Sequence, residues 1–143
     1  MAEKETEYRK LKDKTYEYYS EIGSISCPYL KANVKFNSHG FWHLIYTGRN
    51  KKRDQEIQIL RFKLLKKAVA LLSVTTTLQE FEELKPKKTL YYGFIAIVDD
   101  WKLKVIVKKT GNGAFCFWSV ILNWITSPKR DKIACVSTTL KRD

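Results

Sequence analysis

The chain is poor in the residues that build most metal and disulfide sites, with only two histidines and three cysteines among 143 residues. The cysteines, Cys27, Cys116 and Cys135, show no CxxC spacing and are odd in number. This pattern argues against both a zinc site and a disulfide framework. We therefore expect free, mostly buried thiols in a reducing compartment, with no metal and no cofactor.

Long apolar runs are also missing. The longest stretch without a charge, residues 110–128, contains Gly111, Gly113 and Asn123, and so predicts a turn followed by a strand, not a membrane span. The opening MAEKETEYRK is too charged for a secretory signal. These features predict a soluble, cytoplasmic protein with no membrane partner.

Several common catalytic motifs are absent as well. The sequence has no HExxH, no glycine-rich phosphate loop and no serine hydrolase elbow. What it has in excess is positive charge, with a formal net charge of +12 and a pI near 9.6. Residues 1–21 hold five basic and six acidic groups, so the excess lies in residues 22–143. A region this basic attracts polyanions, and we expect a nucleic-acid partner.

The hydrophobic pattern predicts two helices. Residues 3–22 alternate charges around a narrow aromatic stripe, as a solvated helix does. Residues 53–72 carry an apolar stripe at spacings of three and four, formed by Ile57, Leu60, Leu64, Ala68 and Leu71. Arg53 and Arg61 fall within that stripe. Either they are structural arginines that pair with acidic residues, or they serve a functional site at its border.

The rest of the chain predicts strands. A short strand is expected at residues 34–36, and further strands at 73–81, 91–99, 101–110, 114–126 and 133–137. Asp99-Asp100 and Gly111-Asn112-Gly113 predict tight turns between three of them. The expected fold is α+β, a small compact domain whose N-terminal helices pack on one face of an antiparallel β-meander. Residues 1–22 would form a charged N-terminal helix and residues 23–143 the domain itself.

Alternation along the strands predicts two different faces of this sheet. If both hairpin turns have an even number of residues, one face is uniformly apolar and packs on the helices. That face would hold Phe94, Ala96, Val98, Leu103, Val105, Val107, Cys116, Trp118, Val120, Leu122 and Trp124. The opposite, open face would hold Lys104, Ile106, Lys108, Phe115, Phe117, Ser119 and Asn123, where lysines and rings suit RNA. A one-residue shift at Gly111-Asn112-Gly113 would flip the last strand.

The two histidines, His39 and His43, lie four residues apart and directly precede the basic block RNKKR at 49–53. Imidazole titrates near neutrality, so it can take and give a proton. Cleavage of RNA needs a base, an acid and cations around the phosphate, and no metal. His43 beside arginines and lysines is a candidate for this chemistry, although a lone histidine is more often structural.

Two longer stretches resemble a known group of nucleases. GFWHLIYTGRNKKRDQEIQILRFKLLKKA and YYGFIAIVDDWKLKVIVKKTGNGAFCFWSVILNW are similar to phage and mobile-element members of the barnase–EndoU–colicin E5/D–RelE-like (BECR) superfamily. Members share a histidine after a short strand, an arginine-bearing helix, a meander and a late F-x-S. The likeness spans roughly residues 34–126. It implies a small α+β fold and a metal-independent endoribonuclease, often a toxin, that leaves a 2′,3′-cyclic phosphate.

The resemblance also implies roles for individual residues. His43 matches the family histidine and would act as general acid or base. Arg53, Arg61 and Lys108 would hold and stabilise the phosphate, and Ser119 would orient the phosphate or the histidine. His39 has no clear counterpart, and Asn123 stands where members often have proline. The basic residues expected to bind flanking RNA backbone are Arg49, Lys51, Lys52 and Lys104.

Two alternatives to an enzyme stay open at this point. The same basic face could belong to a non-catalytic RNA- or DNA-binding module. It could also belong to an interaction protein that binds an acidic partner such as an antitoxin or immunity protein. Incubation with labelled RNA in EDTA separates the enzyme from both.

Overall fold

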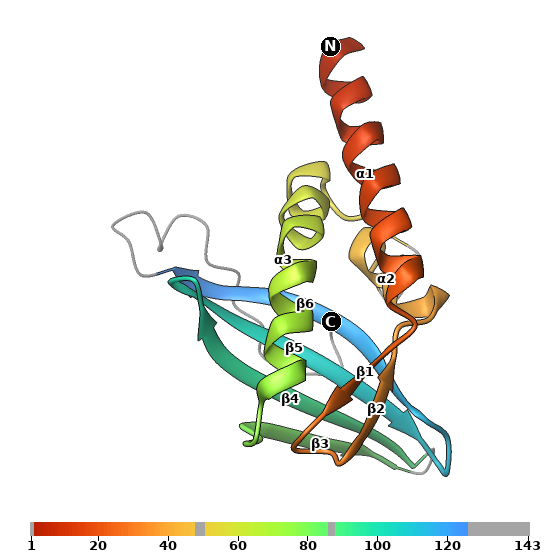
Figure 1. The fold of residues 1–143 in the computed structure, drawn as a ribbon. Coiled ribbons are helices and arrows are strands. Elements are labelled where there is room, and N and C mark those ends of the chain that lie inside the picture. Colours follow the sequence, from red (N-terminus) through yellow and green to blue (C-terminus); the bar gives the residue numbers. More distant parts are fainter. Residues whose placement is uncertain (1, 48–50, 86–87, 126–143) are drawn as a thin grey trace.

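The computed structural model describes residues 2–47, 51–85 and 88–125, and in that part of the chain it shows three helices and six strands (Figure 1). The helices are α1 (Ala2–Ile22), α2 (Ser38–Ile45) and α3 (Gln55–Val74). The strands are β1 (Ser24–Cys27), β2 (Ala32–Lys35), β3 (Glu80–Leu84), β4 (Thr89–Val98), β5 (Trp101–Thr110) and β6 (Phe115–Ile125). The predicted α+β class is confirmed. The strand expected at residues 133–137 lies outside the described residues.

The strands form one sheet in the order β1-β2-β6-β5-β4-β3. The expected antiparallel meander is present as β3, β4, β5 and β6. The sheet as a whole is mixed, because β2 pairs with β6 in parallel at only two positions, Val34–Phe115 and Lys35–Cys116. The pairing of β2 with β6 therefore ends at Cys116. The helix α2, which follows β2 in the chain, also lies close to β6.

A shared apolar core joins α3 to the sheet. The helix buries Phe62, Leu64, Leu65, Ala68 and Leu71, and the sheet supplies the buried side chains Leu103, Val105, Val107, Val120 and Leu122. Burying one large apolar side chain contributes about 1.5–3 kcal/mol, so this stripe fixes the position of α3 on the sheet.

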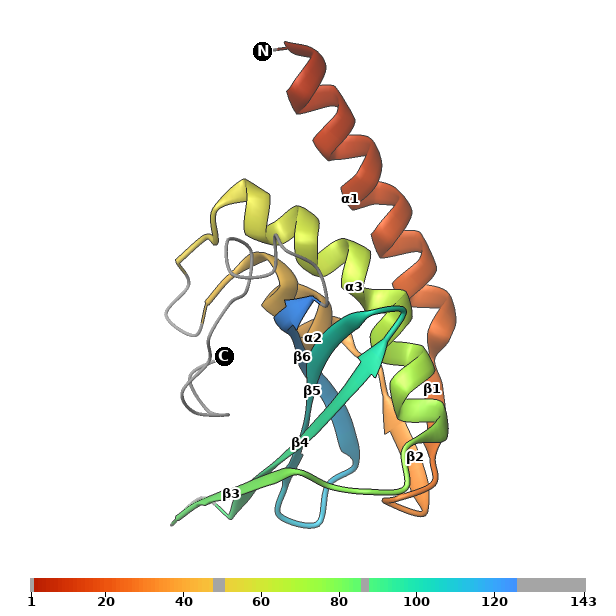
Figure 2. The same cartoon turned by 90° about the vertical axis from the view of Figure 1, so that its left-hand side faces the viewer.

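The first helix projects away from the sheet, and its C-terminal end reaches the core (Figures 1 and 2). Tyr19 is buried there, with its ring centroid 5.6 Å from that of Phe36 and 6.2 Å from that of Phe117. Its hydroxyl donates a hydrogen bond to the carbonyl oxygen of Asn37 at 2.6 Å. Burial raises the pKa of the Tyr19 hydroxyl, so it stays a donor across the neutral range.

One local expectation was wrong. The helix α3 continues to Val74, so residues 73–81 do not form one strand, and β3 begins only at Glu80.

The turn Asp99-Asp100 is confirmed. Both residues have positive φ, 51° and 68°, as a type I′ turn requires, and Val98 pairs with Trp101 across it.

The faces of β6 differ from expectation at its start, because the turn before it has an odd number of residues. Lys108 pairs with Cys116 and Val107 with Phe117. Phe117 is therefore fully buried in the core, where an open position had been expected, and Cys116 lies on the face of Lys108.

A bulge at Trp118 then restores the expected alternation. Val107 pairs with Phe117 but Ile106 pairs with Ser119, so Trp118 is an extra residue in β6. After it, Val120 pairs with Val105, so the two side chains share the helix-side face as predicted. Trp118 itself does not join the helix-side core, as the sequence suggested. It packs with a second buried cluster, formed by Tyr91, Ile106 and Ile121.

Candidate functional site

The short helix α2 carries both histidines. Asn37 caps its start, with its side-chain oxygen accepting a hydrogen bond from the Gly40 amide at 3.3 Å. His39 and His43 are four residues apart and so lie on the same side of the helix. Their surroundings differ, because His39 is exposed whereas His43 is only 2% exposed.

Trp118 is the common neighbour of His43 and Lys108. Its ring centroid lies 3.9 Å from that of His43, and the Lys108 ammonium sits 4.1 Å from the centre of the indole. A cation over an indole face is held by the ring's electrons, with an attraction of about 0.5–2 kcal/mol. The odd-numbered turn before β6 puts Cys116 on the face of Lys108, and Trp118, two residues later, lies on that same face.

Two arginines of the α3 segment complete the cluster. Arg61 is 6% exposed, and its Nη1 donates to Ser119 Oγ at 2.7 Å, while Ser119 is fully buried. Arg53 donates from Nε to the carbonyl oxygen of His43 at 3.0 Å. Of the five residues expected to be catalytic, His43 and Lys108 contact the Trp118 ring. Ser119 follows Trp118 in the chain and binds Arg61, and Arg53 binds the carbonyl oxygen of His43.

The basic residues that were expected to bind RNA differ in their exposure to solvent. Lys104 is 3% exposed, and its ammonium forms an ion pair with Glu80 at 2.9 Å. Its assignment to an open RNA face is therefore wrong, because Glu80 of β3 lies across it. Lys51 and Lys52 are exposed, as predicted. Arg49 lies outside the described residues.

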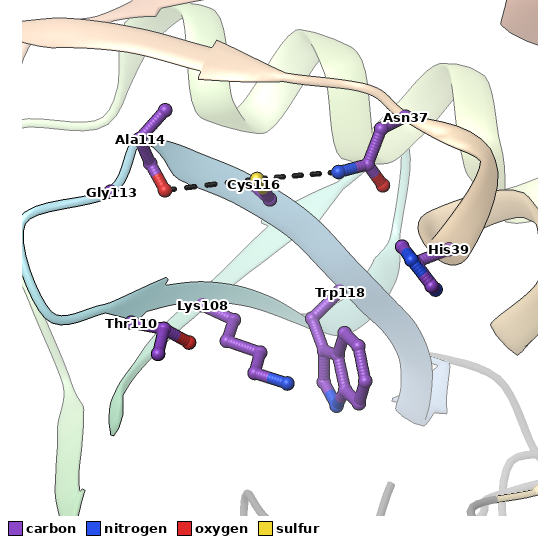
Figure 3. Close-up of a pocket in the computed structure, with 8 residues that line it drawn as sticks. All are labelled: Asn37, His39, Lys108, Thr110, Gly113, Ala114, Cys116 and Trp118. Carbon is purple, nitrogen blue, oxygen red and sulfur yellow. Dashed lines mark hydrogen bonds between the residues drawn. The ribbon is translucent and has the colours of Figure 1, made fainter. Parts of the chain in front are cut away.

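An open cavity of about 340 Å³ adjoins this cluster (Figure 3). Its lining comes from α2 and its cap, from β5, from β6 and from the turn between these strands. The lining residues are Asn37, His39, Lys108, Thr110, Gly113, Ala114, Cys116 and Trp118. Asn37 Nδ2 donates to Cys116 Sγ at 3.4 Å and joins α2 to β6 across the cavity.

The cavity contains residues that the sequence reasoning passed over. His39 was treated as a flank of His43, and Trp118 was placed in the helix-side core. The four-residue spacing of the histidines could have indicated a helix with both rings on one side. Trp118 lies on the face of the cavity because the turn at Gly111-Asn112-Gly113 is one residue different from the even-numbered turn that was assumed.

The described residues show two further features. Cys27 and Cys116 are free thiols, the first buried and the second half-buried, whereas Cys135 lies outside the described residues. Residues 2–47, 51–85 and 88–125 contain no cluster of three or more metal-ligating side chains, and none of their helices is long and apolar enough to cross a membrane.

Comparison of the chain with protein-family models, with curated proteins and with solved structures found no match. The site is therefore argued from its own geometry.

Proposed function

We propose that the protein is a metal-independent endoribonuclease that cleaves RNA to a 2′,3′-cyclic phosphate, as the BECR-like resemblance implies. One observation carries the proposal. His43 of α2 and Lys108 of β5 contact Trp118 beside an open cavity, and the next residue of β6, Ser119, binds Arg61 of α3.

The chemistry requires few parts. The 2′-oxygen forms a bond to phosphorus as it loses its proton, and the bond from phosphorus to the 5′-oxygen breaks as that oxygen gains one. His43 supplies one of these proton transfers. Lys108 faces the cavity, where its positive charge would stabilise charge that develops on the phosphate, and Arg53 and Arg61, bound to the His43 carbonyl and to Ser119, would add to this effect.

The burial of His43 favours one competing function. An imidazole that is 2% exposed meets substrate only after the Trp118 ring moves aside. If the ring stays in place, the same cationic and aromatic surface would bind single-stranded RNA without cleaving it. A non-catalytic RNA-binding module is therefore the second candidate.

Labelled total RNA incubated with purified protein in EDTA tests the proposal. Cleavage into fragments that end in a cyclic phosphate is expected, at an unchanged rate after metal removal. RNA that is bound but left intact would favour the binding module. Cleavage that disappears in EDTA and returns with one divalent ion would contradict the metal-independent mechanism.

The setting of this activity belongs to the same proposal. The free thiols Cys27 and Cys116 suit a reducing cytoplasm, where RNA is abundant. A ribonuclease there requires control in its own cell, and an acidic antitoxin or immunity protein would suit a chain of net charge +12.

A further inference from the structure

The cavity next to the cluster has the chemistry of a single nucleotide site. Its volume of about 340 Å³ is in the range of small-ligand sites. Lys108 offers a cation for a phosphate, Trp118 a ring against which a base can stack, and Asn37 and Thr110 polar groups for hydrogen bonds. Figure 3 shows His39 of α2, Lys108 of β5 and Trp118 of β6 around this one space.

Each histidine of α2 has its own relation to Trp118. Side chains four apart on a helix have Cβ atoms about 5–6 Å from each other. His43 packs on the Trp118 ring, and His39 lines the open cavity that Trp118 also lines. His43 is 2% exposed and is not among the residues that line the cavity, so it acts on a phosphate bound there only when the Trp118 ring moves aside.

We propose that this cavity binds one nucleotide of single-stranded RNA and that His39 is a second catalytic residue, the general acid. The inference rests on the proposed ribonuclease function. His43 takes the 2′-hydroxyl proton as the 2′-oxygen bonds to phosphorus. His39 gives its proton to the 5′-oxygen as the bond from phosphorus to that oxygen breaks.

The exposure of the two imidazole rings decides which histidine is the general acid and which is the general base. The departing 5′-oxygen carries the rest of the RNA strand, which must leave toward solvent, and His39 is the exposed histidine. Water can then reprotonate His39 after each turnover. The other titratable groups near it are Lys108 and Cys116 in the cavity lining, and Tyr19 of α1, which binds the Asn37 carbonyl.

Leaving groups of different acidity test this assignment. Ordinary RNA needs a proton on its leaving 5′-oxygen, whereas ribonucleoside 3′-(4-nitrophenyl phosphates) release a nitrophenolate that needs none. His39→Ala is expected to lower cleavage of RNA by about 10²–10⁴-fold, the usual contribution of a general acid. It should leave release of nitrophenolate within a few-fold of the wild-type rate. His43→Ala should lower both.

The controls separate failure of this inference from failure of the proposed function. Ser38→Ala, an exposed neighbour on the same helix and outside the cavity lining, should cleave both substrates normally. A wild-type protein that cleaves neither substrate overturns the ribonuclease function, and the role of His39 with it. A wild-type protein that cleaves both, with His39→Ala equally active on RNA, overturns the role of His39 alone. Equal losses on both substrates would show that His39 is not the acid.

Discussion

At the level of single residues, Trp118 links groups that would otherwise be separate. Its ring contacts both the His43 ring and the Lys108 ammonium, and the next residue, Ser119, accepts the Arg61 hydrogen bond. Each of these contacts also has a purely structural use, since rings pack and buried polar groups require partners. Mutations that separate activity from stability are therefore the informative ones.

His43 should affect turnover far more than RNA affinity. We expect His43→Gln to lower the single-turnover cleavage rate by about 10²-fold or more, since a proton-transfer group is lost while the buried volume is largely kept. Affinity for a non-cleavable 2′-deoxy strand should change little, because binding is spread over many phosphate contacts.

The denaturant midpoint of His43→Gln must be measured on the same sample. A normal cleavage rate for the folded fraction, together with a lowered midpoint, would show that His43 is only a core residue.

Ser119 tests the buried arginine. In Ser119→Ala the guanidinium of Arg61 loses a 2.7 Å hydrogen bond in a fully buried place. A buried polar group that loses one partner costs about 1–3 kcal/mol, so we expect that decrease in the free energy of unfolding.

Ser73→Ala is the matched control for this change. The Ser73 hydroxyl donates to the Ala70 carbonyl at 2.8 Å near the exposed end of α3, so its loss should change stability by less than about 0.5 kcal/mol. Equal effects of the two substitutions would show that the Arg61–Ser119 hydrogen bond adds nothing.

At the level of elements, α2 depends on its neighbours for its place. With eight residues it is shorter than the ~12–15 residues that an isolated helix requires, so packing against β6 and the end of α1 must hold it. Gly40 makes this packing close. A Cβ at Gly40 would meet the Tyr19 hydroxyl, the Phe117 carbonyl oxygen at 2.7 Å and the Phe117 ring at 2.9 Å.

Gly40→Ala should therefore destabilise the protein. Alanine favours a helix over glycine by up to about 1 kcal/mol, but crowding in a packed core costs about 1–3 kcal/mol. One of the atoms that the new Cβ would meet belongs to the backbone of β6 and cannot rotate away. We therefore expect the cost of crowding to exceed the gain in helix propensity and to shift α2 away from β6. We expect a lower denaturant midpoint and, because α2 carries both histidines, slower RNA cleavage. A variant as stable and active as the wild type would show that α2 adapts freely.

The length of an element's apolar pattern explains whether it was predictable from the sequence. The helix α3 and the strands β4 and β5 have long, periodic apolar patterns, and their places were expected within a few residues. The pattern of α2 is too short to show a period, and tertiary packing decides its form. The bulge at Trp118 depends on how β5 and β6 align, which no single strand encodes. The sequence thus indicated several residues that lie together here, but not the burial of His43 or the placement of Trp118 beside it.

At the level of the whole molecule, positive charge is the strongest property that the chain has. The net charge of +12 arises outside the first helix, whose residues 2–22 are nearly balanced. Some of the remaining basic side chains already have acidic partners. Lys104 is buried and forms an ion pair with Glu80, and Lys67 forms an ion pair with Asp99. The exposed basic residues that remain include Lys51 and Lys52, shortly before α3.

The salt dependence of RNA binding measures which cations take part. Each contact to a single-stranded phosphate contributes about 0.7 to the slope of log affinity against log salt. The double variant Lys51→Ala and Lys52→Ala should therefore lower the slope by about 1.4 if both residues contact phosphates. Its matched control is Lys10→Ala with Lys14→Ala, which removes the same charge from exposed positions of the balanced helix α1. If RNA binds at the α2–β6 cavity and the adjoining basic segment, the control changes affinity weakly and leaves the slope unchanged. Equal decreases in slope for both double variants would show that RNA binds the whole basic surface without a preferred track, and would remove the argument that the basic block and the histidines act on one strand.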